Sequence, residues 1–184
     1  GRFNSGLFFA QEAHLSPRTA LADLRAGLLA DGAFFEQVDA DPDDFAASGM
    51  TIDCRGFQAR TDIADLRGVK GEMLILSCPD VSLSRPVRLL HPRAPLYIVP
   101  RGDGIFMLGA TMVEGRAGKH ISARALLQLL SAAYALHPGF AEANVIEIGV
   151  DSRPAFADNL PRIRRNGNLI RVNGLFRHGF LLAP

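Results

Sequence analysis

Apolar residues recur at helical spacing in two parts of the chain, which predicts two amphipathic helices. The first is expected over 17–30, because Ser16 suits a helix N-cap, Pro17 suits the first helical position and Gly32 suits the end. Its apolar positions are Leu21, Leu24 and Leu28. The second is expected between Ser122 and Pro138. Its apolar face consists of Ala125, Leu126, Leu129, Leu130 and Ala133.

Short apolar runs bounded by turn residues predict strands in the rest of the chain. The expected strands are 34–38, 50–54, 70–77, 87–91, 96–100, 105–111, 144–152 and 169–172. Asp103-Gly104 and Asn166-Gly167 are expected to be tight turns. The succession of strands after residue 68 favours a largely antiparallel sheet, which suits a substrate-covering domain better than a nucleotide fold.

The strand expected at 50–54 leads directly into Gly56. Such an exit is where α/β sheets let ligands approach the carboxyl ends of their strands. A buried strand followed by an ordinary turn fits the same residues equally well, so the pattern alone leaves both interpretations open.

Composition limits the choice of function without selecting one. The chain has 184 residues, 48% of them apolar, and a net charge of +1, so neither a nucleic-acid nor a membrane partner is indicated. No apolar run approaches the roughly 20 residues of a membrane helix. Cys54 and Cys78 are far apart, which argues against a zinc site and a disulfide framework and favours a reducing, cytoplasmic compartment.

Several clusters have the composition of a site without its spacing. The acidic run over 39–44 is expected to be a solvated loop, and Arg162-Ile-Arg-Arg165 with Arg171 a solvated turn rather than a nucleic-acid patch. Gly115-Arg-Ala-Gly-Lys-His120 lacks the length of a phosphate loop. The histidines show no metal-ligand spacing, and no serine or cysteine has a catalytic signature, so we expect neither a metal site nor a catalytic side chain.

Two arginines in the last third of the chain are candidates for binding an acidic group. Arg153 follows an apolar strand and precedes a proline, and its planar guanidinium suits a carboxylate. Arg177 lies between Gly174 and Gly179, which would let the backbone approach a flat ligand closely. An arginine in a surface ion pair is the alternative for Arg153.

Taken together, several segments resemble the FAD-dependent D-amino-acid oxidase superfamily, and within it the glycine oxidases that serve synthesis of the thiamine thiazole. The matching segments, in the family's order, are Leu66-Arg-Gly-Val-Lys-Gly-Glu72, Leu96-Tyr-Ile-Val-Pro-Arg101, Met107-Leu-Gly-Ala-Thr111, Ser152-Arg-Pro154, Asp158-Asn-Leu-Pro161 and Asn173-Gly-Leu-Phe-Arg-His-Gly-Phe-Leu-Leu-Ala-Pro184. Each motif alone is weakly specific, but their order and spacing together are specific.

The resemblance implies an α+β fold in which a mostly antiparallel substrate-binding sheet with helices accompanies part of an α/β FAD-binding domain. Residues 1–66 would belong to the FAD-binding domain, 67–152 to the substrate-binding domain, and 153–184 to the segment that returns to the first. The family's amino-terminal Gly-x-Gly-x-x-Gly segment is not found in these residues. The resemblance therefore leaves open whether they hold FAD unaided.

The resemblance also implies roles for particular residues. Arg153 would pair with the substrate carboxylate, Tyr97 would face the same carboxylate, and Arg177 would lie close to both flavin and substrate; for Tyr97, a core aromatic is the alternative. Backbone contacts to the flavin are expected along the ribbon Leu175, Phe176, Arg177, His178, Gly179, Phe180 and Leu181. Val38 would contact the adenine end of FAD.

The implied activity is FAD-dependent oxidation of glycine or a similar small amino acid or amine to an imine, with oxygen as electron acceptor and hydrogen peroxide as product. A homo-oligomer is possible within this resemblance. Leu175 and His178 replace residues that are commonly polar in the family, which puts the exact amine in doubt. Sarcosine or a D-amino acid is the alternative substrate for an oxidase or a dehydrogenase, and a truncated, non-catalytic chain without FAD is the other alternative.

Overall fold

The computed structural model describes residues 3, 5–91, 95–115 and 118–177, which form two compact units. The first unit consists of Gly1–Gln37, Met73–Ala110 and Ile121–Gly149, and the second of Val38–Glu72, Thr111–His120 and Val150–Pro184. The chain therefore passes repeatedly between the units, and two long strands, β2 (Arg67–Ser77) and β7 (Asn144–Ala155), contribute residues to both. These two strands pair with each other.

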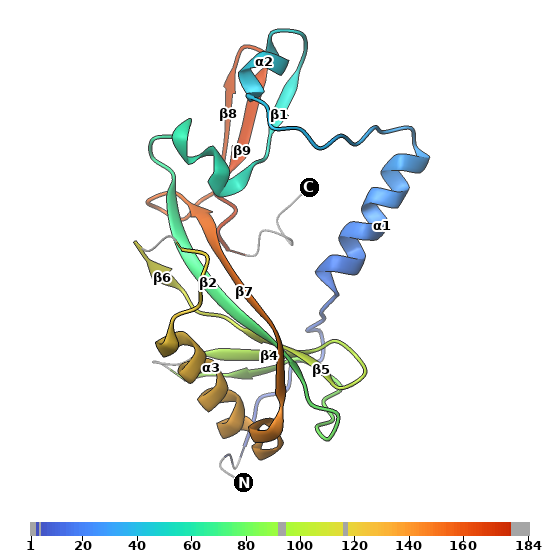
Figure 1. Ribbon diagram of the computed structural model, residues 1–184, viewed down its shortest axis with the longest axis vertical. Helices are drawn as coiled ribbons and strands as arrows, with labels where there is room; N and C mark the ends of the chain where they lie inside the picture. The colour runs from blue at the N-terminus through green and yellow to red at the C-terminus, as the bar shows by residue number, and fades with distance from the viewer. Residues whose placement is uncertain (1–2, 4, 92–94, 116–117, 178–184) are drawn as a thin grey trace. The chain divides into compact units, whose positions relative to one another are not determined.

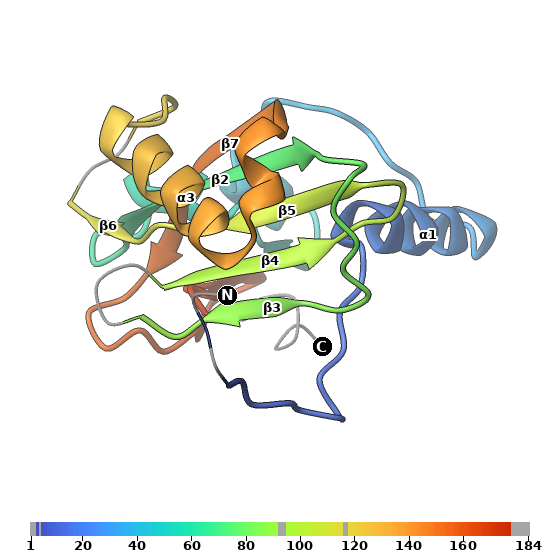
Figure 2. The same ribbon diagram turned by 90° about the horizontal axis from the view of Figure 1, so that it is seen from below.

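The first unit is built on an antiparallel sheet that one helix covers. The strands β3 (Val87–Leu89), β4 (Leu96–Pro100), β5 (Ile105–Gly109) and the second half of β2 lie side by side in this order (Figure 2). Helix α3 (Ala123–Leu136) lies across one face of this sheet, and the short 3-10 helix η2 (Pro138–Glu142) follows it. Ser122 caps α3 as expected, since its hydroxyl accepts a hydrogen bond from the Ala125 amide at 3.1 Å.

The core of the first unit forms between α3 and the sheet. Alternate residues of β2, β4 and β5 point toward the helix and are fully buried. The principal buried side chains are Leu74, Leu76, Ile98, Phe106, Leu108, Leu129 and Phe140. The apolar periodicity predicted from the sequence therefore corresponds to real faces in both the helix and the strands.

Helix α1 (Pro17–Ala30) has the predicted bounds but buries none of its residues. The segment after it corrects a prediction, because residues 33–40 adopt no regular secondary structure although a strand was expected over 34–38. Phe34 is 84% exposed, and the Phe35 ring lies beneath the Arg25 guanidinium. A strand needs a neighbour for its backbone hydrogen bonds, and apolar residues alone do not supply one.

The second unit contains a three-stranded sheet with both parallel and antiparallel pairs. Strand β9 (Leu169–Asn173) lies between β1 (Thr51–Asp53), which runs parallel to it, and β8 (Arg162–Asn166), which runs antiparallel. The short helix α2 (Pro42–Ala46) packs beside β1 and β9 (Figure 1).

The rest of the second unit includes the 3-10 helix η1 (Gly56–Thr61), the first half of β2, the two-residue strand β6 (Val113–Glu114) that pairs with it, and residues 150–155 of β7. Small apolar clusters hold these pieces. One joins Ala59, Ile63, Leu66 and Phe156, and the other joins Val69, Ala155 and Phe176.

Two charged segments differ from their predictions. The acidic run over 39–44 was expected to be a loop, but it enters α2, because the Asp41 carboxylate caps the helix by accepting from the Asp43 amide at 3.0 Å. The arginine-rich segment at 162–165 was expected to be a turn, but it is strand β8. Charged side chains suit an edge strand because they discourage further strand pairing.

Among the described residues, no helix is long and apolar enough to cross a membrane.

Candidate active site

Arg153 lies near the end of β7, where its guanidinium rests directly on the backbone of Gly71 in β2. A Cβ atom added to Gly71 would lie 2.3 Å from the Nη1 atom of Arg153 and 2.5 Å from its Cζ atom. The Nη1 group donates a hydrogen bond to the Thr111 carbonyl oxygen at 3.1 Å. Arg153 is half-buried. The missing side chain at Gly71 therefore creates the flat surface on which the guanidinium lies.

The guanidinium of Arg153 retains donors that the protein does not use. In the described part of the chain, its one hydrogen bond is to Thr111, and no ion pair joins it to a carboxylate. A guanidinium carries five N–H groups in a planar fork. A half-buried, oriented cation of this kind suits a ligand carboxylate.

A buried ion pair lies beside this arginine. The Lys70 Nζ atom lies 2.8 Å from Glu72 Oε1 and donates to the His120 carbonyl at 2.6 Å. The other carboxylate oxygen of Glu72 accepts from the Thr111 hydroxyl at 2.7 Å. The sequence predictions did not include Gly71, Glu72 or Thr111 as individual site residues. Two opposite charges, two residues apart in an otherwise apolar strand, would have indicated Lys70 and Glu72.

Tyr97 lies in β4 of the first unit, directly opposite Gly109 in β5. Its side chain is half-buried and covers Gly109, since a Cβ atom at that glycine would lie 2.5 Å from the tyrosine hydroxyl. Arg153 belongs to the second unit, so the structure describes the two predicted substrate-binding residues separately. The pairing of Tyr97 with a substrate carboxylate stays a prediction.

The residues expected to contact flavin begin where β9 ends. Leu175 is half-buried, the Phe176 side chain packs in the cluster with Val69 and Ala155, and Arg177 is exposed with its guanidinium 5.6 Å from the Phe176 ring centre. His178, Gly179, Phe180 and Leu181 lie outside the described residues. Val38 is 53% exposed in the coil before α2, and its contact with the adenine end of FAD stays a prediction.

The described start of this segment, Gly174–Arg177, lies at a sheet edge that suits a dinucleotide. β1 and β9 are parallel, so the segments that follow them, which begin at Cys54 and Gly174, emerge at the same edge of the sheet. The side-chain amide of Asn173 links these two segments, because its Nδ2 atom donates to the Gly56 carbonyl at 2.8 Å. Gly56 and Gly174 both have positive φ, at 58° and 81°, which gives tight exits. The carboxyl edge of parallel strands is where α/β sheets bind cofactors, so these residues fit FAD.

Two arginines surround a buried carboxylate in the same sheet. Asp53 accepts from the Arg55 guanidinium through both oxygens at 3.0 Å, and Arg171 Nε lies 3.6 Å from it. The hydrogen bonds from Arg55 lower the pKa of Asp53 below its ordinary value, while burial acts in the opposite direction. An ion pair between Asp53 in β1 and Arg171 in β9 thus links the two neighbouring strands.

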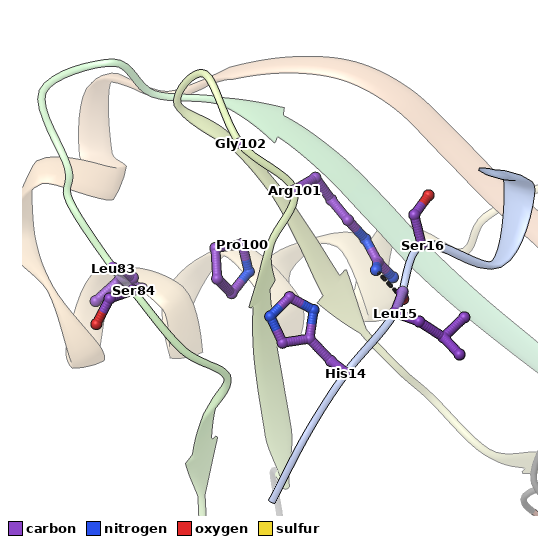
Figure 3. Close-up of a pocket in the computed structure, with 8 residues that line it drawn as sticks. All are labelled: His14, Leu15, Ser16, Leu83, Ser84, Pro100, Arg101 and Gly102. Carbon is purple, nitrogen blue, oxygen red and sulfur yellow. Dashed lines mark hydrogen bonds between the residues drawn. The ribbon is translucent and has the colours of Figure 1, made fainter. Parts of the chain in front are cut away.

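A cavity of about 360 Å³ in the first unit contains none of the predicted site residues (Figure 3). Its wall includes Arg101, which donates to the Leu15 carbonyl at 2.5 Å and thereby holds the segment before α1. Burial lowers the pKa of the Arg101 guanidinium. The contacts of Arg101 therefore indicate a structural role. Elsewhere in the described residues, no group of three or more His, Cys, Asp or Glu side chains could hold a metal ion.

The family of FAD-dependent oxidoreductases known as DAO matches the chain over residues 1–184. The chain belongs to this family, whose cofactor is FAD.

Curated relatives and solved structures agree with this assignment. The chain is 54% identical, over its whole length, to the Rhizobium etli protein named as a thiamine biosynthesis oxidoreductase, ThiO, and covers 56% of that protein. Glycine oxidase from Geobacillus kaustophilus is 28% identical with a TM-score of 0.57, over 65% of this chain and 32% of that one. Iminodiacetate oxidase from Chelativorans sp. BNC1 is 28% identical with a TM-score of 0.58, over 77% and 38%. The chain thus spans about half the length of the curated relative that it matches throughout.

These findings confirm the resemblance inferred from the sequence motifs, the α+β fold class, the oxidoreductase family and FAD as its cofactor. They leave the substrate, the domain boundaries and the individual site residues as predictions.

Proposed function

We propose that the protein that carries this chain is an FAD-dependent oxidase of glycine or a similar small amino acid. The observation that supports this most directly is Arg153, a half-buried cation that rests on Gly71 and, in the described part of the chain, has no carboxylate partner. Relatives named as glycine oxidase support the substrate class.

In this proposal Arg153 binds the substrate carboxylate through paired N–H···O bonds and thereby fixes the position of the α-carbon. Tyr97 would contribute its hydroxyl to the same carboxylate, and Arg177 would add positive charge near it. The backbone of Leu175–Arg177 and of the residues that follow would hydrogen-bond the cofactor ring. The chemistry that FAD would supply, when bound, is acceptance of a hydride from the α-carbon of the neutral amine.

The proposed reaction balances without a catalytic acid or base of the protein. Loss of a hydride and a proton converts a neutral amine into a neutral imine, and oxygen with two electrons and two protons gives hydrogen peroxide. The imine then either reacts with water to give the 2-oxo acid and ammonia or is taken onward as the imine. The protein's task is to bind, orient and exclude water, which suits a set of residues without a poised histidine or carboxylate.

We also propose that the product serves synthesis of the thiamine thiazole, which rests on the likeness to the Rhizobium etli ThiO protein. A second candidate substrate is an N-substituted glycine such as sarcosine, because the chain is also similar to an iminodiacetate oxidase. Both candidates keep the carboxylate and differ only at nitrogen.

The direct test is a screen of peroxide production by the FAD-loaded, full-length protein. Glycine, sarcosine, iminodiacetate and several D-amino acids are compared by kcat/KM, and flavin absorbance verifies that the cofactor is bound. We expect glycine or an N-substituted glycine to give the highest kcat/KM. A flavin-loaded protein that oxidises none of these carboxylated amines would contradict the proposal, and a protein that stays colourless with added FAD would support the non-catalytic alternative.

A further inference from the structure

We propose that Thr111 and Glu72, supported by Lys70, are positioning residues that hold Arg153 in place for the substrate carboxylate. This inference rests on the proposed function, in which Arg153 binds that carboxylate. In this proposal none of the three residues contacts the substrate. They act on Arg153 through the hydrogen bond that it donates to the Thr111 carbonyl.

Three hydrogen bonds fix Thr111 to Glu72. The Thr111 amide donates to the Glu72 carbonyl at 3.1 Å, and the Glu72 amide donates to the Thr111 hydroxyl at 3.0 Å. The same hydroxyl donates to Glu72 Oε2 at 2.7 Å. Since both the backbone and the side chain of Thr111 are held, the direction of its carbonyl is held as well. That carbonyl accepts the hydrogen bond from Arg153 Nη1.

The strand places these groups on two faces. Side chains alternate along β2, so Lys70 and Glu72 point to one face and Gly71 lies on the other, against Arg153. One face of the guanidinium thus lies against Gly71, and its Nη1 atom is bonded to the Thr111 carbonyl. These two contacts restrict the orientation of the guanidinium, and its other N–H groups make no hydrogen bond to the described residues.

Charge balance explains why Lys70 belongs to the group. The Glu72 side chain is fully buried and the Lys70 side chain is 10% exposed, with 2.8 Å between their charged atoms. The pair is neutral as a whole. Lys70 thus places a positive charge against the buried carboxylate that accepts from the Thr111 hydroxyl.

A buried ion pair is not needed for stability alone, because apolar side chains of similar size pack as well or better in its place. Hydrogen bonds are directional, however, and a carboxylate that accepts from both Lys70 and Thr111 fixes the latter in a way that packing would not. The network of Lys70, Glu72 and Thr111 therefore suits a role in orienting the Thr111 carbonyl.

The test measures binding of acetate, which has the carboxylate and lacks the amine, to the FAD-loaded, full-length protein by calorimetry. Thr111→Val keeps the shape of the side chain and removes its hydroxyl, whereas Thr111→Ser retains the hydroxyl. We expect Thr111→Val to raise the Kd of acetate and the KM of glycine about tenfold. Thr111→Ser should restore both to near the native values, and kcat should change less than KM in each case.

Arg153→Ala separates a positioning effect from a general structural one. If Thr111 acts through Arg153, Thr111→Val will not weaken acetate binding further in the Arg153→Ala background. Equal losses in both backgrounds would overturn the inference. A native Kd for acetate in Thr111→Val, together with weak acetate binding in Arg153→Ala, would also overturn the inference. That outcome would leave the proposed function intact. An unchanged Kd in Arg153→Ala would overturn the carboxylate anchor and this inference with it.

Glu72→Gln provides a second variant if Thr111→Val does not fold. It keeps the size of the side chain and removes the charge that holds Lys70 and the Thr111 hydroxyl. We expect a raised acetate Kd here as well, and an unchanged one in a protein with native flavin content would contradict the inference. Thr61→Val is the matched control, because Thr61 bonds only the neighbouring Asp62 among the described residues.

Discussion

Gly71 decides where the Arg153 guanidinium can lie. Any side chain at this position would occupy the space that the guanidinium now fills, since even a methyl group would lie 2.3 Å from Nη1. Gly71 also lies between Lys70 and Glu72, so one short segment of β2 supplies both the surface under the arginine and the network that orients the Thr111 carbonyl. The position of the proposed carboxylate anchor thus depends on a residue with no functional group.

Gly71→Ala should therefore displace Arg153 and raise the KM for glycine at least about tenfold, with a smaller change in kcat. The physical reason is steric, because the backbone of β2 is held in the sheet while the arginine side chain can rotate away. Steady-state kinetics on the FAD-loaded protein measure the effect. Gly49→Ala is the control, since an added Cβ there meets nothing within 4 Å. A native KM in Gly71→Ala would show that the anchor lies elsewhere.

At the scale of elements, β1, β8 and β9 form a small sheet whose ion pairs differ in how deeply they are buried. Asp53 is fully buried between Arg55 and Arg171, whereas the pair of Arg164 with Asp65 is exposed. The buried carboxylate links two strands whose exits form the proposed cofactor edge. Loss of its charge would leave Arg171 without its partner in β1.

Asp53→Asn is expected to lower the free energy of unfolding by about 3 kcal/mol at neutral pH. Because the folded-state pKa of Asp53 is lowered, its contribution is present above the unfolded pKa of about 4 and is lost as pH falls through the folded pKa. The difference between native and variant protein should therefore shrink in acid. Chemical denaturation at several pH values measures it.

Asp65→Asn removes the exposed carboxylate and serves as the control, with little change expected at any pH. A destabilisation by Asp53→Asn that is no larger than that of the control would show that the buried pair does not brace the sheet.

Sequence patterns predicted the elements that local signals define. Helix α1 follows a Ser-Pro start, α3 follows a Ser cap, and β4 occupies the predicted 96–100 segment. Residues 34–38 were predicted wrongly because strand formation depends on a neighbour, which local sequence does not reveal. β8 was missed because its arginines resemble a solvated turn, although they suit an edge strand.

The same limit applies to the site. Arg153 was identified from its place after a strand and from the resemblance, but Thr111 lies 42 residues away in the chain and is joined to it by one hydrogen bond. Gly71 was part of a recognised motif, yet its closeness to the guanidinium depends on how β2 and β7 pair. Contacts between distant segments are a property of the fold, and residue patterns do not contain them directly.

At the scale of the whole molecule, the chain belongs to the family of FAD-dependent oxidoreductases and covers 56% of its Rhizobium etli relative. The described residues contain a candidate anchor in one unit and Tyr97 in the other, and the segment predicted to contact flavin begins after β9. Glycine oxidation by the whole protein is the activity that these features support best. Its central claim is that Arg153 binds the substrate carboxylate.

The most direct measurement of that claim is the apparent KM for glycine in Arg153→Ala, compared with the native protein and with Arg18→Ala. Arg18 is an exposed arginine paired with Glu147, so it controls for the loss of a positive charge. The account predicts a KM about 100-fold higher in Arg153→Ala, from loss of a charged, bidentate pair, and a native KM in Arg18→Ala. A native KM for glycine in Arg153→Ala, with flavin fully bound, would contradict it.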